Sequence, residues 1–324
     1  MLMQLYPGAL LTATLVAVRG LRSHSLDSSG ALAAALLGYA ALASPLKVFA
    51  ACLLGFYFAG SKATKVKTAV KATYEEPDAP ASNSAPSFGP SPAGSAPPSY
   101  PGRSATQVAC NALVGSLCAL AWRVLYSGER AGAQNWQADG GWCVVGLDPG
   151  GGRESRALVL AAVAFWAACC GDTLGILSRS QPRLLTTFRP CPRGTNGGVS
   201  AWGTLVSLVG GLLVGALALG SLAAQGQMQA CTAERGWAQE LMTVAGAAGL
   251  GGSMLDSFLG ATLQPTYFSS TRQLVVHSPH PSPAYPDDKI VRVPGSGFAV
   301  LSNNGVNLVS AGLVAAIAGW WALQ

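Results

Sequence analysis

The sequence predicts an all-α, polytopic integral membrane protein, a helical bundle of about seven or eight transmembrane helices with a disordered Pro/Ser-rich loop. Half of its 324 residues are hydrophobic and only 10% are charged, whereas soluble domains carry about 25% charged residues. Forty glycines add to this bias, because glycine is more frequent in transmembrane helices than in soluble ones. We therefore expect residues 1–324 to form a single membrane domain.

Eight apolar segments approach the length that crosses a bilayer. They cover residues 5–18, 31–43, 46–59, 106–122, 157–177, 200–223, 241–263 and 305–323. A full crossing needs about 20 residues, so the second and third segments, which Ser44 and Pro45 separate, form either two tilted spans or a re-entrant pair. Both arrangements return the chain to the side that it left, so the sidedness of the later loops is the same.

Basic residues divide unequally between the two sets of loops. The loops 19–30, 60–105, 178–199 and 264–304 carry fourteen of the twenty Lys and Arg residues, and the remaining six lie in the other set. The positive-inside bias places the first set in the cytoplasm and both termini on the opposite side.

The net charge of +6 does not indicate a nucleic-acid partner, because the basic residues lie between apolar spans rather than in a patch interleaved with exposed aromatics. No transit peptide is visible, which favours an endomembrane or the plasma membrane over the plastid. The oligomeric state stays open.

Residues 74–103 are rich in Pro, Ser and Ala. This composition cannot bury enough apolar surface to offset its ordering entropy, so it predicts a disordered cytoplasmic linker.

The eight cysteines contain no C-x-x-C pair. They are expected to be small buried hydrophobic residues.

Three aspartates lie inside or at the edge of the apolar segments. Asp27 precedes the second span, Asp172 lies near the end of the fifth and Asp256 toward the end of the seventh, each followed by a hydroxyl residue and then a glycine. A carboxylate near a bilayer core costs several kcal/mol, so such a residue is a functional-site hypothesis. All three are candidate catalytic residues. The alternative is a structural role, as a helix N-cap or in an interhelical hydrogen bond.

Other polar side chains lie near the same predicted face. They are Thr173 and Ser257, next to the aspartates, and Asn303, Asn304 and Asn307, before the eighth span. Mg²⁺ favours a few carboxylates, retained waters and phosphate oxygens. We therefore expect Asp172 and Asp256 to hold Mg²⁺, with the hydroxyls and amides beside the metal or the lipid.

Basic and glycine-rich loops accompany these acids and predict phosphate binding. The candidates are Lys62, Lys65, Arg183, Arg193, Gly194, Thr195, Asn196, Gly197 and Gly198. Arginine grips phosphate with forked donors, and the glycines can expose backbone N–H groups to an anion as a nest. Two alternatives remain: the lysines can anchor to anionic lipid headgroups, and the glycine-rich loop can be a simple turn.

Seven ordered motifs resemble the transmembrane protein 19 family over nearly the whole chain outside the Pro-rich linker. They are Ser25–Gly30, Gly60–Lys67, Gly171–Thr173, Pro182–Thr187, Gly194–Gly198, Asp256–Thr262 and Asn303–Asn307. A plastid branch of the family is similar to phytyl phosphate kinase. The resemblance thus implies Mg-dependent transfer of a phosphoryl group from a nucleoside triphosphate, CTP or ATP, to an isoprenoid or other lipid monophosphate at the cytoplasmic face. A plant branch resembles a glucose-responsive plasma-membrane protein, which leaves a non-catalytic transporter or sugar-response regulator as the alternative.

The chain departs from the family pattern at two positions. The Gly-Asp-Thr motif is usually followed by an aromatic residue, two small residues and a glutamate, but here Thr173 runs directly into Leu174 and Gly175. Some relatives also carry aspartate where this chain has Ser302. Both departures remove an acid from the predicted site.

Overall fold

The structure is a computed structural model that describes residues 5–71, 102–126, 152–175, 180–225 and 236–324, with residues 64–71 and 152 described by their backbone alone. Within these ranges the eight apolar segments all form helices. The helices are α1 (Pro7–Arg22), α2 (Ser28–Leu42), α3 (Val48–Lys71), α4 (Ala105–Tyr126), α5 (Gly152–Gly175), α6 (Ala201–Ala224), α8 (Trp237–Leu263) and α9 (Asn303–Ala322).

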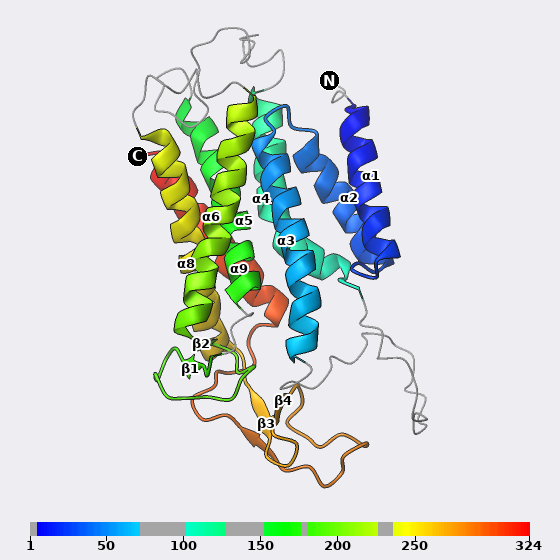
Figure 1. Cartoon of the computed structure of the whole chain (residues 1–324), viewed down its shortest axis with the longest axis vertical. Coiled ribbons are helices and arrows are strands. Elements are labelled where there is room, and N and C mark those ends of the chain that lie inside the picture. The colour runs from blue at the N-terminus through cyan, green and yellow to red at the C-terminus, as the bar shows by residue number, and fades with distance from the viewer. Residues whose placement is uncertain (1–4, 72–101, 127–151, 176–179, 226–235) are drawn as a thin grey trace.

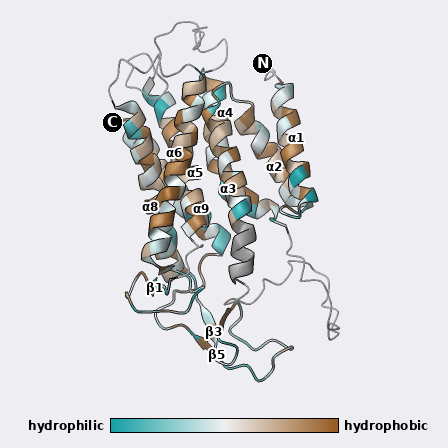
Figure 2. Ribbon diagram, viewed as in Figure 1, coloured by the Kyte–Doolittle hydropathy of each residue, from teal (hydrophilic) through white to brown (hydrophobic). Residues whose placement is uncertain are grey.

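The helices run roughly side by side, and the short strands gather at one end of the bundle (Figure 1). The beginning of α1 and the end of α9 lie at the other end (Figure 1). Apolar residues dominate the middle of the helices, and hydrophilic ones are frequent near their ends (Figure 2). By length and composition, α4, residues 153–175 of α5, α6 and α9 can each cross a membrane. The prediction of a helical membrane protein is therefore confirmed, with α2 and residues 48–63 of α3 as shorter apolar helices.

The prediction of an all-α fold missed five short strands. Strand β1 (Arg183–Leu184) pairs antiparallel with β2 (Gly198–Val199). Strand β3 (Tyr267–Ser269) lies between β4 (Leu274–Val276) and β5 (Ile290–Arg292), antiparallel to both. Runs of two or three residues are too short to show the alternating pattern that predicts a strand.

The folded part of the chain also includes the end of the predicted linker. Most of the linker lies outside the described residues, but the Arg103 N–H donates to the Ser25 carbonyl at 3.0 Å and the Asp27 N–H donates to the Arg103 carbonyl at 3.1 Å. A Cβ on Gly102 would lie 2.3 Å from the carbonyl carbon of Leu26, so only glycine allows this approach. Residues 102 and 103, which the prediction assigned to the linker, therefore belong to the folded part of the chain.

Among the described residues, the buried hydrophobic side chains form three clusters. One of them, made of Leu184, Cys191 and Ala261, packs β1 and the loop after it against α8. The main cluster surrounds α5, where Phe165 and Trp166 are fully buried. A smaller cluster of Ala17, Leu26 and Ala31 holds α1 and α2 together. The α1–α2 pair therefore has a core of its own beside the main one.

One buried arginine joins three helices at the end of the bundle remote from the strands. Arg156 of α5 forms an ion pair with Glu240 of α8 and donates from Nη1 to the Ala322 carbonyl of α9 at 3.0 Å. Its guanidinium also lies 5.2 Å from the ring centroid of Trp321. The Arg156 side chain is only 7% exposed, so these partners take the place of water around its charge.

Glycines bring the backbones of α5, α6 and α8 into direct contact. A Cβ on Gly249 of α8 would lie 2.6 Å from the Cα of Gly211 in α6, and one on Gly171 of α5 would lie 2.4 Å from the Gly249 carbonyl oxygen. Small residues permit such close approach of membrane helices. This contact places the backbone next to Asp172 against α8.

We expect Gly249→Val to destabilise the bundle, because the added side chain meets backbone atoms that cannot move aside. Overpacking costs about 1–3 kcal/mol. Gly251→Val is the matched control on the same helix, since a Cβ at Gly251 meets nothing within 4 Å. Thermal unfolding of the two purified variants in detergent measures the difference, and equal midpoints would contradict the contact.

Candidate functional site

A polar cavity of about 1040 Å³ opens at the end of the bundle that carries the strands. Its lining comes from the middle of α3, the ends of α5 and α8, the beginnings of α4, α6 and α9, and the loops between them. Segments that lie far apart in the sequence thus meet in one place, and this cavity is the candidate functional site.

All three predicted aspartates line the cavity. Asp172 and Asp256 both lie within electrostatic range of the Cys169 thiol, one turn before Asp172. Asp256 accepts a hydrogen bond from Ser310 Oγ at 3.1 Å. With its nitrogen turned toward α8, the Asn307 amide also donates to Asp256 Oδ1 at 3.1 Å. The cavity therefore gathers these acids, and Asp256 also forms the interhelical hydrogen bond that the structural alternative predicted.

Asp27 has a clear structural role in addition to its place in the cavity. It is the N-cap of α2, and its Oδ1 accepts from the Gly30 N–H and from Ser29 Oγ, each at 2.7 Å. The hydrogen bond from Gly30, and then that from Ser29, holds the pKa of Asp27 below its usual range. A capping carboxylate satisfies N–H groups that the first turn leaves unpaired.

The predicted hydroxyls and amides also line the cavity. They are Thr173, Ser257, Asn303, Asn304 and Asn307. Thr173 Oγ1 donates to the Cys169 carbonyl at 2.8 Å. Ser302, where the family resemblance implies aspartate in some relatives, is the N-cap of α9 and accepts from the Gly305 N–H at 3.2 Å. Either residue type can cap a helix in this way.

The glycine-rich loop from Arg193 to Gly198 lines the cavity but does not form the continuous nest that the sequence suggested. The Asn196 N–H donates to Thr266 Oγ1 at 3.0 Å, and the Gly198 N–H donates to the Thr195 carbonyl at 2.9 Å. Gly194 and Gly197 have φ angles of 86° and 79°, which glycine adopts without strain. The loop is a tight turn packed on α8 that presents Arg193 to the cavity.

Two other predicted phosphate ligands, Arg183 and Lys62, lie outside the described lining of the cavity. Arg183 is exposed, lies outside the described cavity lining and donates from Nη1 to the Phe188 carbonyl at 2.9 Å, where Phe188 has a positive φ. Lys62 is exposed and also lies outside that lining. The side chain of Lys65 lies outside the described residues. Arg183 thus supports a turn rather than the site, and Lys62 fits the alternative of a headgroup anchor.

Several cavity residues were missed by the sequence analysis. Arg103 lines the cavity, and its Nη2 lies 3.4 Å from Ser61 Oγ. Gln107 and Asn111 line it from the first turns of α4, and their i, i+4 spacing in an apolar helix was a usable signal. His24 and His277 line it from loops.

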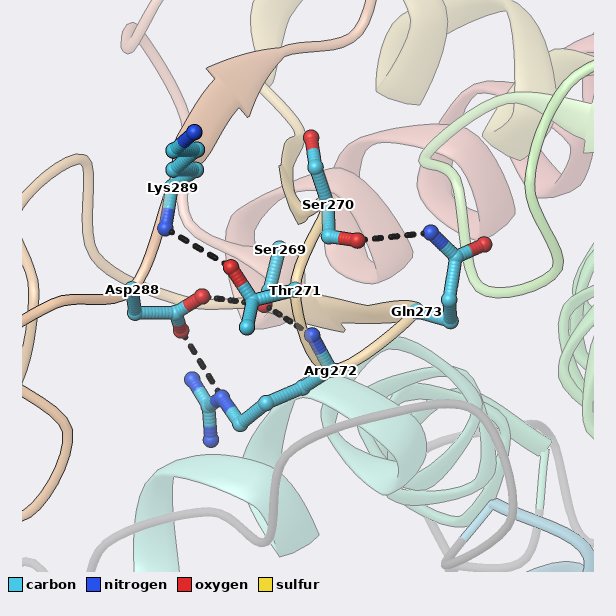
Figure 3. Close-up of polar contacts among 7 residues, drawn as sticks. All are labelled: Ser269, Ser270, Thr271, Arg272, Gln273, Asp288 and Lys289. Atoms are coloured by element: carbon cyan, nitrogen blue, oxygen red, sulfur yellow. Dashed lines mark hydrogen bonds and ion pairs between the residues drawn. The ribbon is translucent and has the colours of Figure 1, made fainter.

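The β3–β5 sheet forms one wall of the cavity and is held by a buried carboxylate (Figure 3). Asp288 accepts from Ser269 Oγ at the end of β3 and from Arg272 Nε at 2.8 Å. The Arg272 guanidinium also lies 4.4 Å from the Tyr285 ring centroid. The Ser269 hydroxyl, and then Arg272, holds the pKa of Asp288 below its usual range.

We expect Asp288→Asn to loosen this wall in a pH-dependent way. Because the folded-state pKa is lowered, the stabilisation is fully present above the unfolded pKa of about 3.9 and is lost as the pH falls through the folded pKa. Hydrogen exchange over residues 267–292 should be faster in the variant at pH 7, with the difference shrinking below about pH 4. Asp287→Asn, at an exposed neighbour, is the control. A difference that persists at low pH would contradict the role of the charge.

The donor set of the cavity is compatible with Mg²⁺ but not with a site built from protein ligands alone. Among the described residues, no group of three or more His, Cys, Asp or Glu side chains is arranged to hold a metal ion. Mg²⁺ usually keeps several waters and uses one or two carboxylates plus substrate phosphates. Asp172 and Asp256, with the neighbouring amide and hydroxyl oxygens, are ligands of this kind.

The fold and the cavity define an integral membrane protein with a polar site at one end of its helices. The family of integral membrane proteins described as DUF92 matches residues 11–315. The chain belongs to this family, which confirms the resemblance that its motifs indicated.

Two relatives show how far the likeness extends. Protein PGR of Arabidopsis thaliana is 32% identical over 313 residues, which cover 93% of this chain and 91% of that protein. An uncharacterized membrane protein of Methanocaldococcus jannaschii is 29% identical over 113 residues, 33% of this chain and 40% of the relative. No solved structure matches the chain.

Proposed function

We propose that the protein transfers a phosphoryl group from a nucleoside triphosphate to a lipid monophosphate at the cytoplasmic face of its membrane. The observation that carries the proposal is the cavity at one end of a membrane bundle, which Asp172, Asp256, Arg103 and Arg193 all line. Acids that hold a metal and arginines that bind phosphate are the groups that phosphoryl transfer requires. An isoprenoid monophosphate is the substrate that the family resemblance supports.

The proposal includes a full topology. All eight helices would cross the membrane. The cavity would open to the cytoplasm, where the more basic loops would lie. Helix α2 has 15 residues and is about 22 Å long, which is shorter than a hydrocarbon core of about 30 Å. The bilayer would therefore thin beside the α1–α2 pair. We place the protein in an endomembrane or the plasma membrane.

In the reaction, the terminal P–O bond of the donor breaks while an oxygen of the lipid phosphate forms a new P–O bond. The products are a lipid diphosphate and a nucleoside diphosphate. Arg103 and Arg193 would bind and orient the phosphates, and the amides of Asn303 and Asn307 would position oxygens at the α9 end. Asp172 and Asp256 would hold Mg²⁺, which when bound neutralises charge on the phosphates.

The direct test uses purified protein in nanodiscs with farnesyl or phytyl monophosphate and radiolabelled CTP or ATP. We expect a labelled lipid diphosphate that requires Mg²⁺ and disappears in Asp172→Asn. Absence of product with both donors and both acceptors would overturn the proposal.

A second candidate is a membrane transporter, favoured by the size of the cavity and by the acids within it. It predicts flux of a phosphorylated solute into proteoliposomes without any diphosphate product. Flux lost in Asp256→Asn, with no phosphoryl transfer in the wild type, would select this alternative.

A further inference from the structure

A second cavity adjoins the polar one and is of the opposite character. It is a narrow slot of about 70 Å³ between α1, α2, α3 and α4. Apolar side chains form most of it, among them Leu26, Ala34, Leu37, Leu53, Phe56 and Val108. On a comparable measure one water needs about 10–15 Å³, so the slot has room for a short stretch of a linear chain but not for a bulky group.

The slot and the polar cavity meet at shared residues. Phe56, Arg103, Gln107 and Asn111 line both. Arg103 therefore lies where the apolar slot passes into the polar cavity. A molecule that occupied both would have an apolar chain on one side of this guanidinium and an anionic group on the other.

The slot also lies at the boundary between two clusters of buried hydrophobic residues. Leu26 belongs to the small α1–α2 cluster and Ala34 packs against it, whereas Leu53 and Phe56 belong to the main cluster around α5. The two clusters are separate, so a chain can lie between them without displacing fully packed side chains. The outward-facing leucines of α1 and α2, such as Leu15 and Leu36, are exposed and face the membrane in the proposed topology.

We propose that this slot binds the first part of the hydrocarbon chain of a single-chain lipid phosphate, with Arg103 binding its headgroup at the entrance to the polar cavity. The inference rests on the proposed function for the identity of the headgroup. Charge complementarity at Arg103 and continuity with the polar cavity favour this occupant. The rest of the chain would lie in the bilayer beside α1 and α2.

The test measures binding without any nucleotide, so it does not depend on turnover. A linear alkyl monophosphate that carries a diazirine close to its phosphate is photolysed with the full-length protein in nanodiscs. We expect crosslinks to α2 and α3 residues of the slot, and competition by unlabelled prenyl monophosphate. Crosslinks confined to the outer faces of the bundle would overturn the inference.

Substitutions in the slot and at Arg103 test the inference further. Ala34→Phe fills the slot, and Ala33→Phe, on the same helix but outside the slot lining, is the matched control. We expect Ala34→Phe to lose the slot crosslink and Ala33→Phe to keep it. Arg103→Gln should weaken binding by about 10- to 150-fold, which corresponds to the roughly 1.5–3 kcal/mol that a hydrogen bond to a charged group contributes. Equal crosslinking in both phenylalanine variants would contradict the slot. The positions of the crosslinks in the wild-type protein test the slot separately, so the inference can be tested even if a variant does not fold.

Failures of the two proposals give different results. Slot crosslinks without lipid diphosphate formation would overturn the transfer reaction and leave the slot standing. Lipid diphosphate formation with crosslinks outside the slot would leave the reaction standing and overturn the slot.

Discussion

Replacing Asp256 with asparagine is expected to remove most of the phosphoryl transfer while leaving the protein folded. Asparagine keeps the shape of the side chain and can still accept from Ser310 through its carbonyl oxygen, but it removes the negative charge that faces the cavity. Loss of one preorganised electrostatic group costs about 10²–10³-fold in rate. The measurement is initial rate of lipid diphosphate formation at saturating substrates, with thermal unfolding as the check on folding.

Ser310→Ala separates the charge of Asp256 from its hydrogen bond. It removes the interhelical bond at 3.1 Å and leaves the carboxylate in place. We expect a loss of about 1 kcal/mol in stability and retention of most of the activity. A loss of activity of less than about tenfold in Asp256→Asn would be smaller than an electrostatic role requires. Asp256 would then be a packing residue only.

Asp27→Asn decides the role of the third aspartate. Asparagine caps a helix about as well as aspartate, so the start of α2 should be unaffected. If Asp27 acts only as a cap, activity is retained. A loss as large as that of Asp256→Asn would place Asp27 in the catalytic machinery, as the sequence predicted.

Arg156→Ala is expected to give the largest loss of stability in the molecule. The substitution leaves Glu240 without its ion-pair partner and the Ala322 carbonyl without its donor, in a region where the arginine side chain is only 7% exposed. Breaking a buried pair by removal of one partner costs about 3–5 kcal/mol. Thermal or denaturant unfolding in detergent measures this loss.

The control lies three residues earlier on the same helix. Arg153 is exposed, and Arg153→Ala should change the free energy of unfolding by less than about 0.5 kcal/mol. The double variant Arg156→Met with Glu240→Leu should recover much of the stability, because apolar replacement of a buried pair is often neutral or stabilising. No difference between Arg153→Ala and Arg156→Ala would show that the three-helix contact contributes little.

Long-range apolar patterning made the helices predictable, and local chemistry made Asp27 predictable as a cap. Runs such as residues 157–177 contain enough apolar residues to identify α5 without its neighbours. Asp27 precedes a helix start in sequence, so the capping alternative could be seen before the structure.

The errors share a physical cause, which is dependence on partners distant in the sequence. The Asn196 N–H donates to Thr266, a residue 70 positions away, so the closed form of the glycine-rich loop could not be predicted from the sequence. Arg103 was assigned to the linker because it ends a run rich in Pro, Ser and Ala, although its backbone pairs with the segment around Leu26. Local composition carries no information on either pairing.

If Asp172 and Asp256 hold a metal ion as we propose, the glycine contact between α5 and α8 has a consequence for ion selectivity. Because Gly171 meets Gly249 backbone to backbone, no side chain can rearrange to change the distance between these two helices near Asp172. The distance between the α5 backbone, which carries Asp172, and the α8 backbone, which carries Asp256, is thus fixed. Only the aspartate side chains themselves can adjust the distance between their carboxylates. Oxygen ligands lie about 2.0–2.1 Å from Mg²⁺ but 2.3–2.6 Å from Ca²⁺. The proposed site, with a rigid span between its two helices, would therefore discriminate between these two divalent ions by their radius.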